Sequence, residues 1–293
     1  MRNQGLIINK GYLKFVLPTY LLFLLLTIVP VFGTMGLSLF QFDIALPSDS
    51  PFVGLENYLD LLEDDEFINS VKVMCLLIFI PVLLQAVLGS ALALALHEKP
   101  KGLGWVRSLF LIPAVLPPIV IGLIWKLFFI PESGGMAYFA HWLGLPAVDM
   151  FSDPIPALIM VITASVWAGI PFVTLMLLAN LETLPASYYE AAAIDGAGWW
   201  QRHYHITWPL MIPIVKTVTI FRVLEALAIF PVIFILTGGG PAGATEPINF
   251  FAYRVGFDYL LLGYASAIIV VFFCILFMIC LPLMLRVFAD RRN

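Results

Sequence analysis

The chain has 293 residues, of which 61% are hydrophobic and only 12% are charged, and its mean hydropathy is +0.99. A soluble domain carries about 25% charged residues, so this composition excludes a soluble globular protein. It predicts an all-α protein embedded in a lipid bilayer, with a formal net charge of −4 and no nucleic-acid partner.

Six apolar stretches are long enough to cross about 30 Å of hydrocarbon, which takes about 20 helical residues. They cover residues 13–40, 67–96, 106–130, 155–180, 209–237 and 263–288. An even number of spans places both termini on the same side of the membrane. We therefore expect a single transmembrane domain of six helices over residues 1–293.

The distribution of Lys and Arg predicts which side is cytoplasmic, because these residues accumulate in cytoplasmic connections. Both termini, the connection between the second and third spans and that between the fourth and fifth hold ten of the 15 basic residues. The other connections hold one, Arg254, together with 13 of the 19 acidic residues. Both termini and the connection 181–208 are therefore predicted to be cytoplasmic. The first apolar run has the length of a span and no cleavage site follows it, so we expect it to stay in the membrane.

No catalytic or metal-binding pattern is present in the sequence. Cys75, Cys274 and Cys280 have no partner spacing, which predicts neither a disulfide nor a metal site. His203 and His205 are two residues apart, and on a helix such residues point to different faces. The glycine cluster that starts at Gly238 is not followed by the lysine of a phosphate-binding loop, so the chain is not expected to bind ATP. We expect a transport protein and not an enzyme.

The connection 181–208 contains a short helix with an unusual surface. Pro185 suits a helix start and Gly196 a helix end, which predicts a helix over 185–195. Tyr189, Ala192, Ala193 and Gly196 share one face, on which small side chains let another backbone approach closely. Glu190 and Asp195 flank this face with hydrogen-bond acceptors. The pattern favours docking to another protein over a helix that lies on lipid headgroups, since such helices carry Lys or Arg and this one has neither.

The same connection resembles a known motif. Glu190-Ala191-Ala192, three residues, Gly196, nine residues and Ile206-Thr207-Trp208-Pro209 are similar to the EAA loop of permease subunits in binding-protein-dependent ABC importers, with Trp208 in place of a leucine. Further stretches resemble the sugar-permease branch of this family, which is typified by the permeases of the maltose importer and the glycerol-3-phosphate importer. These stretches are 52–58, 107–125 and 237–241 together with Thr245.

The resemblance implies a type I ABC importer permease fold in the cell inner membrane. It implies a second, homologous permease subunit, a dimer of ATPase subunits that bind ATP and Mg, and a periplasmic or extracellular solute-binding protein that delivers a sugar-like solute. The coupling residues would be Glu190, Ala191, Ala192, Asp195 and Gly196, which enter a cleft of the ATPase. The loop that approaches the binding protein would be Gly238, Gly239, Gly240 and Pro241.

Two charges lie near the middle of the fifth span, where each costs about 2.5 to 3.5 kcal/mol on insertion scales. Arg222 and Glu225 are three residues apart on one helix face, so they can form a structural ion pair. Alternatively, they line the solute pathway with Trp167, Thr163 and Thr174 of the fourth span. A third possibility is that the pair couples transport to an ion gradient in a secondary transporter. An intramembrane enzyme, or a protein that only supports a second permease, are further alternatives.

Overall fold

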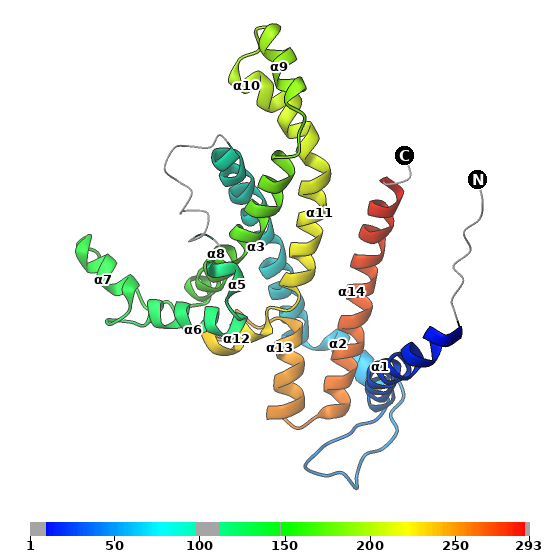
Figure 1. The fold of residues 1–293 in the computed structure, drawn as a ribbon. Helices are drawn as coiled ribbons and strands as arrows, with labels where there is room; N and C mark the ends of the chain where they lie inside the picture. Colours follow the sequence, from blue (N-terminus) through cyan, green and yellow to red (C-terminus); the bar gives the residue numbers. More distant parts are fainter. Residues whose placement is uncertain (1–9, 98–109, 111, 147, 291–293) are drawn as a thin grey trace. The chain divides into compact units, whose positions relative to one another are not determined.

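The computed structural model describes residues 10–97, 110, 112–146 and 148–290 (Figure 1). They belong to two compact units, Met1–Asp64 with Ala252–Met278 and Asp65–Phe251 with Ile279–Asn293. Residues 106–109 and 111 of the third expected span lie outside the described residues. So do six basic residues that contributed to the predicted topology: Arg2, Lys99, Lys101, Arg107, Arg291 and Arg292.

The first unit contains α1 (Lys10–Leu37), α2 (Glu56–Glu63) and most of α14 (Leu262–Asp290). Isolated β-bridges join Phe40 to Phe52 and Asp43 to Leu261. The buried amide of Asn57 on α2 donates to the carbonyl groups of Ser38 and Phe40, at 2.8 and 3.1 Å. The most apolar stretch of α1 is not buried in the structure at all, so its side chains are available to lipid or to another protein chain.

The second unit is built around three long helices that run side by side (Figure 1). The shorter helices α5, α6 and α12 contact α8, and α6 packs on α12. The long helices are α3 (Asp65–His97), α8 (Pro154–Leu181) and α11 (Trp208–Ala226); the shorter ones include α5 (Ile112–Val115), α6 (Pro118–Phe129), α7 (Gly135–Trp142), α12 (Phe230–Leu236) and α13 (Ile248–Tyr253).

The α3–α8 contact is close because glycine faces a larger side chain on both sides. A Cβ atom on Gly89 of α3 would lie 2.6 Å from Val173 of α8. In the other direction, a Cβ atom on Gly169 of α8 would lie 2.4 Å from the Gln85 amide of α3. Small residues let helix backbones approach in a membrane, where association depends on packing and not on escape from water.

Two apolar clusters fill the spaces between the long helices. One joins the first half of α3 to the first half of α8 and to α12, through Leu77, Met160 and Ile233 among others. The other joins the last turns of α3 and α8 to α11, through Ala93, Leu177 and Met211 among others. The segment of α3 around Gln85 lies between these two apolar layers.

The fifth predicted span differs most from its expectation. A single helix over 209–237 is wrong, since α11 ends at Ala226 and α12 begins at Phe230. Pro231 in the first turn of α12 explains the break, because proline lacks an N–H group and disfavours helical geometry in the residue before it. In the other direction the helix starts earlier than expected. Residues 199–207, predicted as part of a loop, form α10 (Trp199–Arg202) and the π-helix η1 (His203–Thr207), which continue into α11.

The third predicted span is also interrupted. The short helix α5 ends at Val115, and α6 begins at Pro118 after Pro117. The consecutive prolines account for this interruption, because the residue before a proline favours extended geometry. The other predicted spans agree with α1, α3, α8 and α14 to within about three residues, which is the usual uncertainty of helix ends.

Four helices of the described chain are long and apolar enough to cross a membrane: Lys14–Leu37, Asp65–His97, Pro154–Leu181 and Trp199–Ala226. Two shorter apolar helices, Pro118–Phe129 and Leu262–Met278, lie in the other two predicted spans. The number of six spans and the cytoplasmic location of both termini stay predictions.

The α3–α8 contact can be tested at Gly89. We expect Gly89→Ala to destabilise the protein by about 1 to 3 kcal/mol, because the new methyl group overlaps the side chain of Val173. Val173→Ala should recover part of this loss, since it removes the overlapping atoms. The thermal midpoint in detergent would measure both effects. Gly36→Ala on α1, where no atom lies within 4 Å, is the control. Equal midpoints for Gly89→Ala and Gly36→Ala would contradict the close contact.

Candidate functional site: the coupling segment, the outer loop and the polar interior

The predicted docking helix is α9 (Ala186–Ile194), one residue shorter at each end than expected. None of its residues is buried, and Ile194 exposes 87% of its surface. Glu190 and Ala191 are exposed, as are Asp195 and Gly196 just beyond the helix. An apolar side chain such as Ile194 gains about 1.5 to 3 kcal/mol when it is fully buried, so this exposed end is suited to contact a partner.

The expected docking face is only partly exposed. Tyr189 and Ala192 are half-buried on the side of α9 that faces the rest of the chain, whereas Ala193 and Gly196 are exposed. The sequence predicted all four on one exposed face. The difference arises because η1 lies beside α9 and covers one edge of it.

Gly196 ends α9 as predicted, through a defined hydrogen-bond pattern. The Ala197 N–H donates to the Ala192 carbonyl at 2.9 Å, and the Gly196 N–H donates to the Ala193 carbonyl at 3.1 Å. This is a Schellman motif, in which the residue after the helix adopts left-handed geometry. Gly196 has φ +75°, a conformation that glycine adopts without steric cost.

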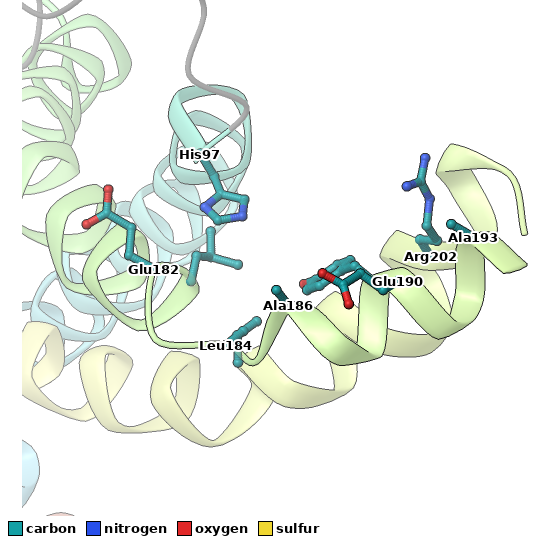
Figure 2. Close-up of a pocket in the computed structure, with 9 residues that line it drawn as sticks. His97, Glu182, Leu184, Ala186, Glu190, Ala193 and Arg202 are labelled. Atoms are coloured by element: carbon teal, nitrogen blue, oxygen red, sulfur yellow. The ribbon is translucent and has the colours of Figure 1, made fainter.

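A groove of about 690 Å³ separates α9 from the ends of α3 and α8 (Figure 2). Its lining includes His97 at the end of α3, Glu182 just after α8, Glu190 on α9 and Arg202 on α10. Figure 2 shows His97 and Glu190 on opposite sides of the groove. The groove therefore combines carboxylate, guanidinium and imidazole groups beside the predicted docking helix.

The predicted outer loop is a compact turn with internal hydrogen bonds. The buried Thr245 hydroxyl lies 2.8 Å from the Thr237 hydroxyl and 2.7 Å from the Gly240 carbonyl. Of the four residues expected to approach a binding protein, Gly238 is exposed, Gly240 and Pro241 are half-buried and Gly239 is buried. A side chain at Gly239 would collide with the Phe250 ring, which explains the need for glycine there.

The outer loop and the predicted coupling segment (residues 181–209, which include α9) lie at opposite ends of α3. The Asn69 amide, in the first turns of α3, donates to the Gly243 carbonyl of the outer loop at 3.0 Å. His97, at the other end of α3, lines the groove beside α9. The 28 residues between them span about 42 Å at 1.5 Å per residue, which exceeds the roughly 30 Å of a hydrocarbon core. This separation supports the prediction that the two segments face opposite sides of a membrane.

Arg222 is buried between three helices. Only 7% of its surface is exposed. Its Nε–H donates to the Gln85 side chain of α3 at 2.8 Å, and the Gln85 amide donates to the Ser165 carbonyl of α8 at 2.9 Å. A second Arg222 nitrogen forms an ion pair with Glu225, and the guanidinium lies 5.9 Å from the centre of the Phe172 ring. Arg222 therefore links α11 to α3 and α8.

The other predicted pathway residues separate into two groups. Thr174 is fully buried near Gly89 in the α3–α8 contact, so it is not accessible to a solute in this conformation. Thr163 and Trp167 are half-buried, the first bonded to the Ile159 carbonyl of its own helix and the second packed edge-on against Trp125. Arg222 and Thr174 are thus buried in this structure, and the role of all five residues in a solute pathway stays a prediction.

Glu225 is the predicted pathway residue that is most exposed. Its side chain exposes 63% of its surface even though it pairs with Arg222. It lies one turn before the break between α11 and α12, where Asn249 of α13 donates to the Leu227 carbonyl at 3.2 Å. Interrupted helices are common at solute sites of transporters.

Sequence reasoning missed Gln85, Ser165 and Gly169, which surround Arg222. A signal for Gln85 was present, since it is a polar residue inside the otherwise apolar second span. Gly169 leaves the space for this contact, because a Cβ atom there would lie 2.5 Å from an Arg222 nitrogen. No local pattern indicates that residues so far apart in the sequence meet.

Residues 85–293 match the model of a family described as the binding-protein-dependent transport system inner membrane component. The chain belongs to this family. It is thus a multi-pass inner-membrane permease, a transport component and not an enzyme. Residues 190–209 of the coupling segment lie within the matched region.

Individual relatives agree with this assignment. The permease is 40% identical to the trehalose/maltose transport system permease protein MalF of Thermococcus litoralis, over 90% of this chain and 88% of that protein. It is 33% identical to the trehalose transport system permease protein SugA of Mycobacterium tuberculosis, over 88% and 82%. Its fold matches a chain in the crystal structure of a bacterial ABC transporter involved in the import of alginate, with a TM-score of 0.80, 22% identity and 96% coverage of both chains.

The end of α9 provides a test of local geometry in this permease. We expect Gly196→Ala to weaken the Schellman motif by about 1 kcal/mol, because alanine resists a positive φ. Gly196→Asn should cost less, since asparagine tolerates left-handed geometry. No atom lies within 4 Å of a Cβ at this position, so steric overlap does not contribute. Hydrogen exchange of the Gly196 and Ala197 amides would measure the effect. Equal protection in the alanine variant and the parent would contradict it.

Proposed function

We propose that this permease forms half of the translocation pathway of an ATP-driven importer for a carbohydrate. The observation that carries the proposal is the exposed helix α9, which bears the EAA pattern and lies at the end of α3 opposite the glycine-rich outer loop. ATPase subunits that bind ATP and Mg dock on α9, and a second permease subunit completes the pathway.

Transport proceeds by alternating access. Closure of the ATPase dimer moves α9, and the long helices α3, α8 and α11 transmit this motion to the solute pathway. A ligand shifts such an equilibrium only through its different affinities for the two states. The loaded binding protein therefore favours one state by binding near the outer loop, at Gly238 and its neighbours. The crystal structure of the alginate transporter in complex with its pentasaccharide-bound periplasmic protein, whose matched chain has the same fold, supports a partner of this kind.

The charge inside the chain favours a neutral solute. At the break after α11 the accessible charge is the Glu225 carboxylate, whereas the Arg222 guanidinium is buried and hydrogen-bonded. An accessible carboxylate accepts hydrogen bonds from sugar hydroxyl groups and repels a phosphate. Relatives named for trehalose and maltose transport fit this inference better than the 32% identical sn-glycerol-3-phosphate transport system permease protein UgpA of Agrobacterium fabrum.

The ion-coupled alternative receives less support. It uses Arg222 and Glu225 as a coupling pair, but Arg222 is hydrogen-bonded to Gln85 and lies near Phe172. A secondary transporter would also have no use for the exposed helix α9. Family membership likewise favours binding-protein-dependent import.

The proposal can be tested with the assembled transporter in lipid nanodiscs. The chain is co-expressed with the permease and ATPase subunits that accompany it, and ATP hydrolysis is measured with candidate binding proteins loaded with trehalose, maltose or glycerol-3-phosphate. We expect stimulation by a binding protein loaded with one of the disaccharides. Failure of any ATPase to co-purify, or solute uptake that follows an ion gradient, would refute the proposal.

Glu190→Lys tests the docking role of α9. We expect correct membrane insertion, because Glu190 is exposed, but solute uptake reduced at least roughly tenfold. Loss of a charged hydrogen bond costs about 1.5 to 3 kcal/mol, and the reversed charge adds repulsion. Glu190→Gln keeps the shape and should lose less. Uptake is compared at equal amounts of inserted protein, and normal uptake by Glu190→Lys would exclude this docking surface.

A further inference from the structure

Helix α9 lies beside a groove and is hydrogen-bonded to a neighbouring helix. The groove of about 690 Å³ lies between α9 and the ends of α3 and α8 (Figure 2). In the part of the chain that the structure describes, one side-chain hydrogen bond connects α9 to another helix, between the hydroxyl groups of Tyr189 and Thr207 at 3.1 Å.

Thr207 is buried and lies at the junction of two helices. It is 2% exposed and is the last residue of the π-helix η1, directly before α11. Its hydroxyl also lies 3.5 Å from the Arg202 carbonyl, to which it donates a weak hydrogen bond. Either hydroxyl can donate in the Tyr189–Thr207 bond, and with the Arg202 carbonyl the two groups form a chain of hydrogen bonds. π-helical turns are frequent at functional positions.

The contact lies between two cavities. Tyr189 lines the groove on one side, and Thr207 lines an apolar pocket of about 170 Å³ with Trp208 and Met211 on the other. The chain segments on either side of α9 are short, and the Tyr189–Thr207 bond joins the middle of α9 to the residue directly before α11.

We propose that Tyr189 and Thr207 are positioning residues that transmit the movement of the docked α9 to α11. This inference rests on the proposed function, in which an ATPase moves α9. Thr207 continues directly into α11, and Arg222 follows 15 residues later, about 22 Å along the helix. There the bonds through Gln85 carry the movement to α3 and α8. The pair is therefore the first link between ATP hydrolysis and the solute pathway.

The experiment compares solute uptake with ATP hydrolysis in proteoliposomes that contain the whole transporter. The variants are Tyr189→Phe, Thr207→Val and the double variant. We expect each single variant to transport roughly two- to tenfold less solute per ATP hydrolysed, the range that corresponds to one neutral hydrogen bond. The double variant should lose no more than either single one, because both remove the same contact.

Two controls separate this role from general stability. Tyr138→Phe removes an exposed hydroxyl on α7, outside the docking helix, and should keep the parental ratio, and Thr207→Ser keeps the hydroxyl and should retain coupling. Co-purification of the ATPase and the thermal midpoint should stay unchanged in all variants. Because Tyr189→Phe keeps the half-buried ring, it still tests the inference if Thr207→Val lowers the yield.

An unchanged ratio of uptake to hydrolysis in Tyr189→Phe, or independent and additive losses in the double variant, would overturn the inference. These outcomes are distinct from failure of the proposed function. That failure shows as an absent ATPase in the purified parent, or as normal uptake by Glu190→Lys.

Discussion

The enclosure of one guanidinium group in an apolar interior is the constraint on which the second unit depends. An uncompensated charge inside a bilayer is costly, so Arg222 has to be supplied with partners from its neighbours. Gln85 provides an acceptor from α3 and passes the hydrogen bond to the Ser165 carbonyl of α8. Gly169 is required because any side chain there would occupy the space of Gln85 and Arg222. These hydrogen bonds oppose both sliding of α3, α8 and α11 along one another and rotation of each helix about its axis.

The polar layer around Arg222 lies between the two apolar clusters of the second unit. This arrangement favours a rigid group of helices. Apolar packing alone permits small sliding movements between helices, whereas directional hydrogen bonds at mid-height oppose them. The coupling segment has the opposite character. Its helix α9 buries no residue and stands beside an open groove. A loosely attached helix can follow the movement of a partner, and a rigid body can carry that movement across the membrane.

The fold is kept in proteins of low sequence identity. A chain of the alginate importer shares it at 22% identity. Positions that demand a particular residue here depend on geometry. Examples are Gly89 and Gly169, where helices approach closely, and Gly196 and Gly239, where the backbone is left-handed. Most lipid-facing or core positions need only an apolar side chain of suitable volume, which many sequences provide.

The sequence by itself determined the apolar segments, the short helix with its end at Gly196 and the resemblance of residues 190–209 to a coupling loop. Hydropathy, helix termination and motif spacing are local properties, so no knowledge of neighbours was needed. Only the tertiary structure decided that Arg222 is bonded to Gln85, that Thr174 is inaccessible and that Tyr189 turns inward to meet Thr207. It also decided that residues 199–207 are helical and that the fifth span is interrupted after Ala226. Each of these features depends on which distant elements lie next to one another. Arg222 and Gln85, for example, are 137 residues apart in the sequence, and no local pattern identifies them as partners.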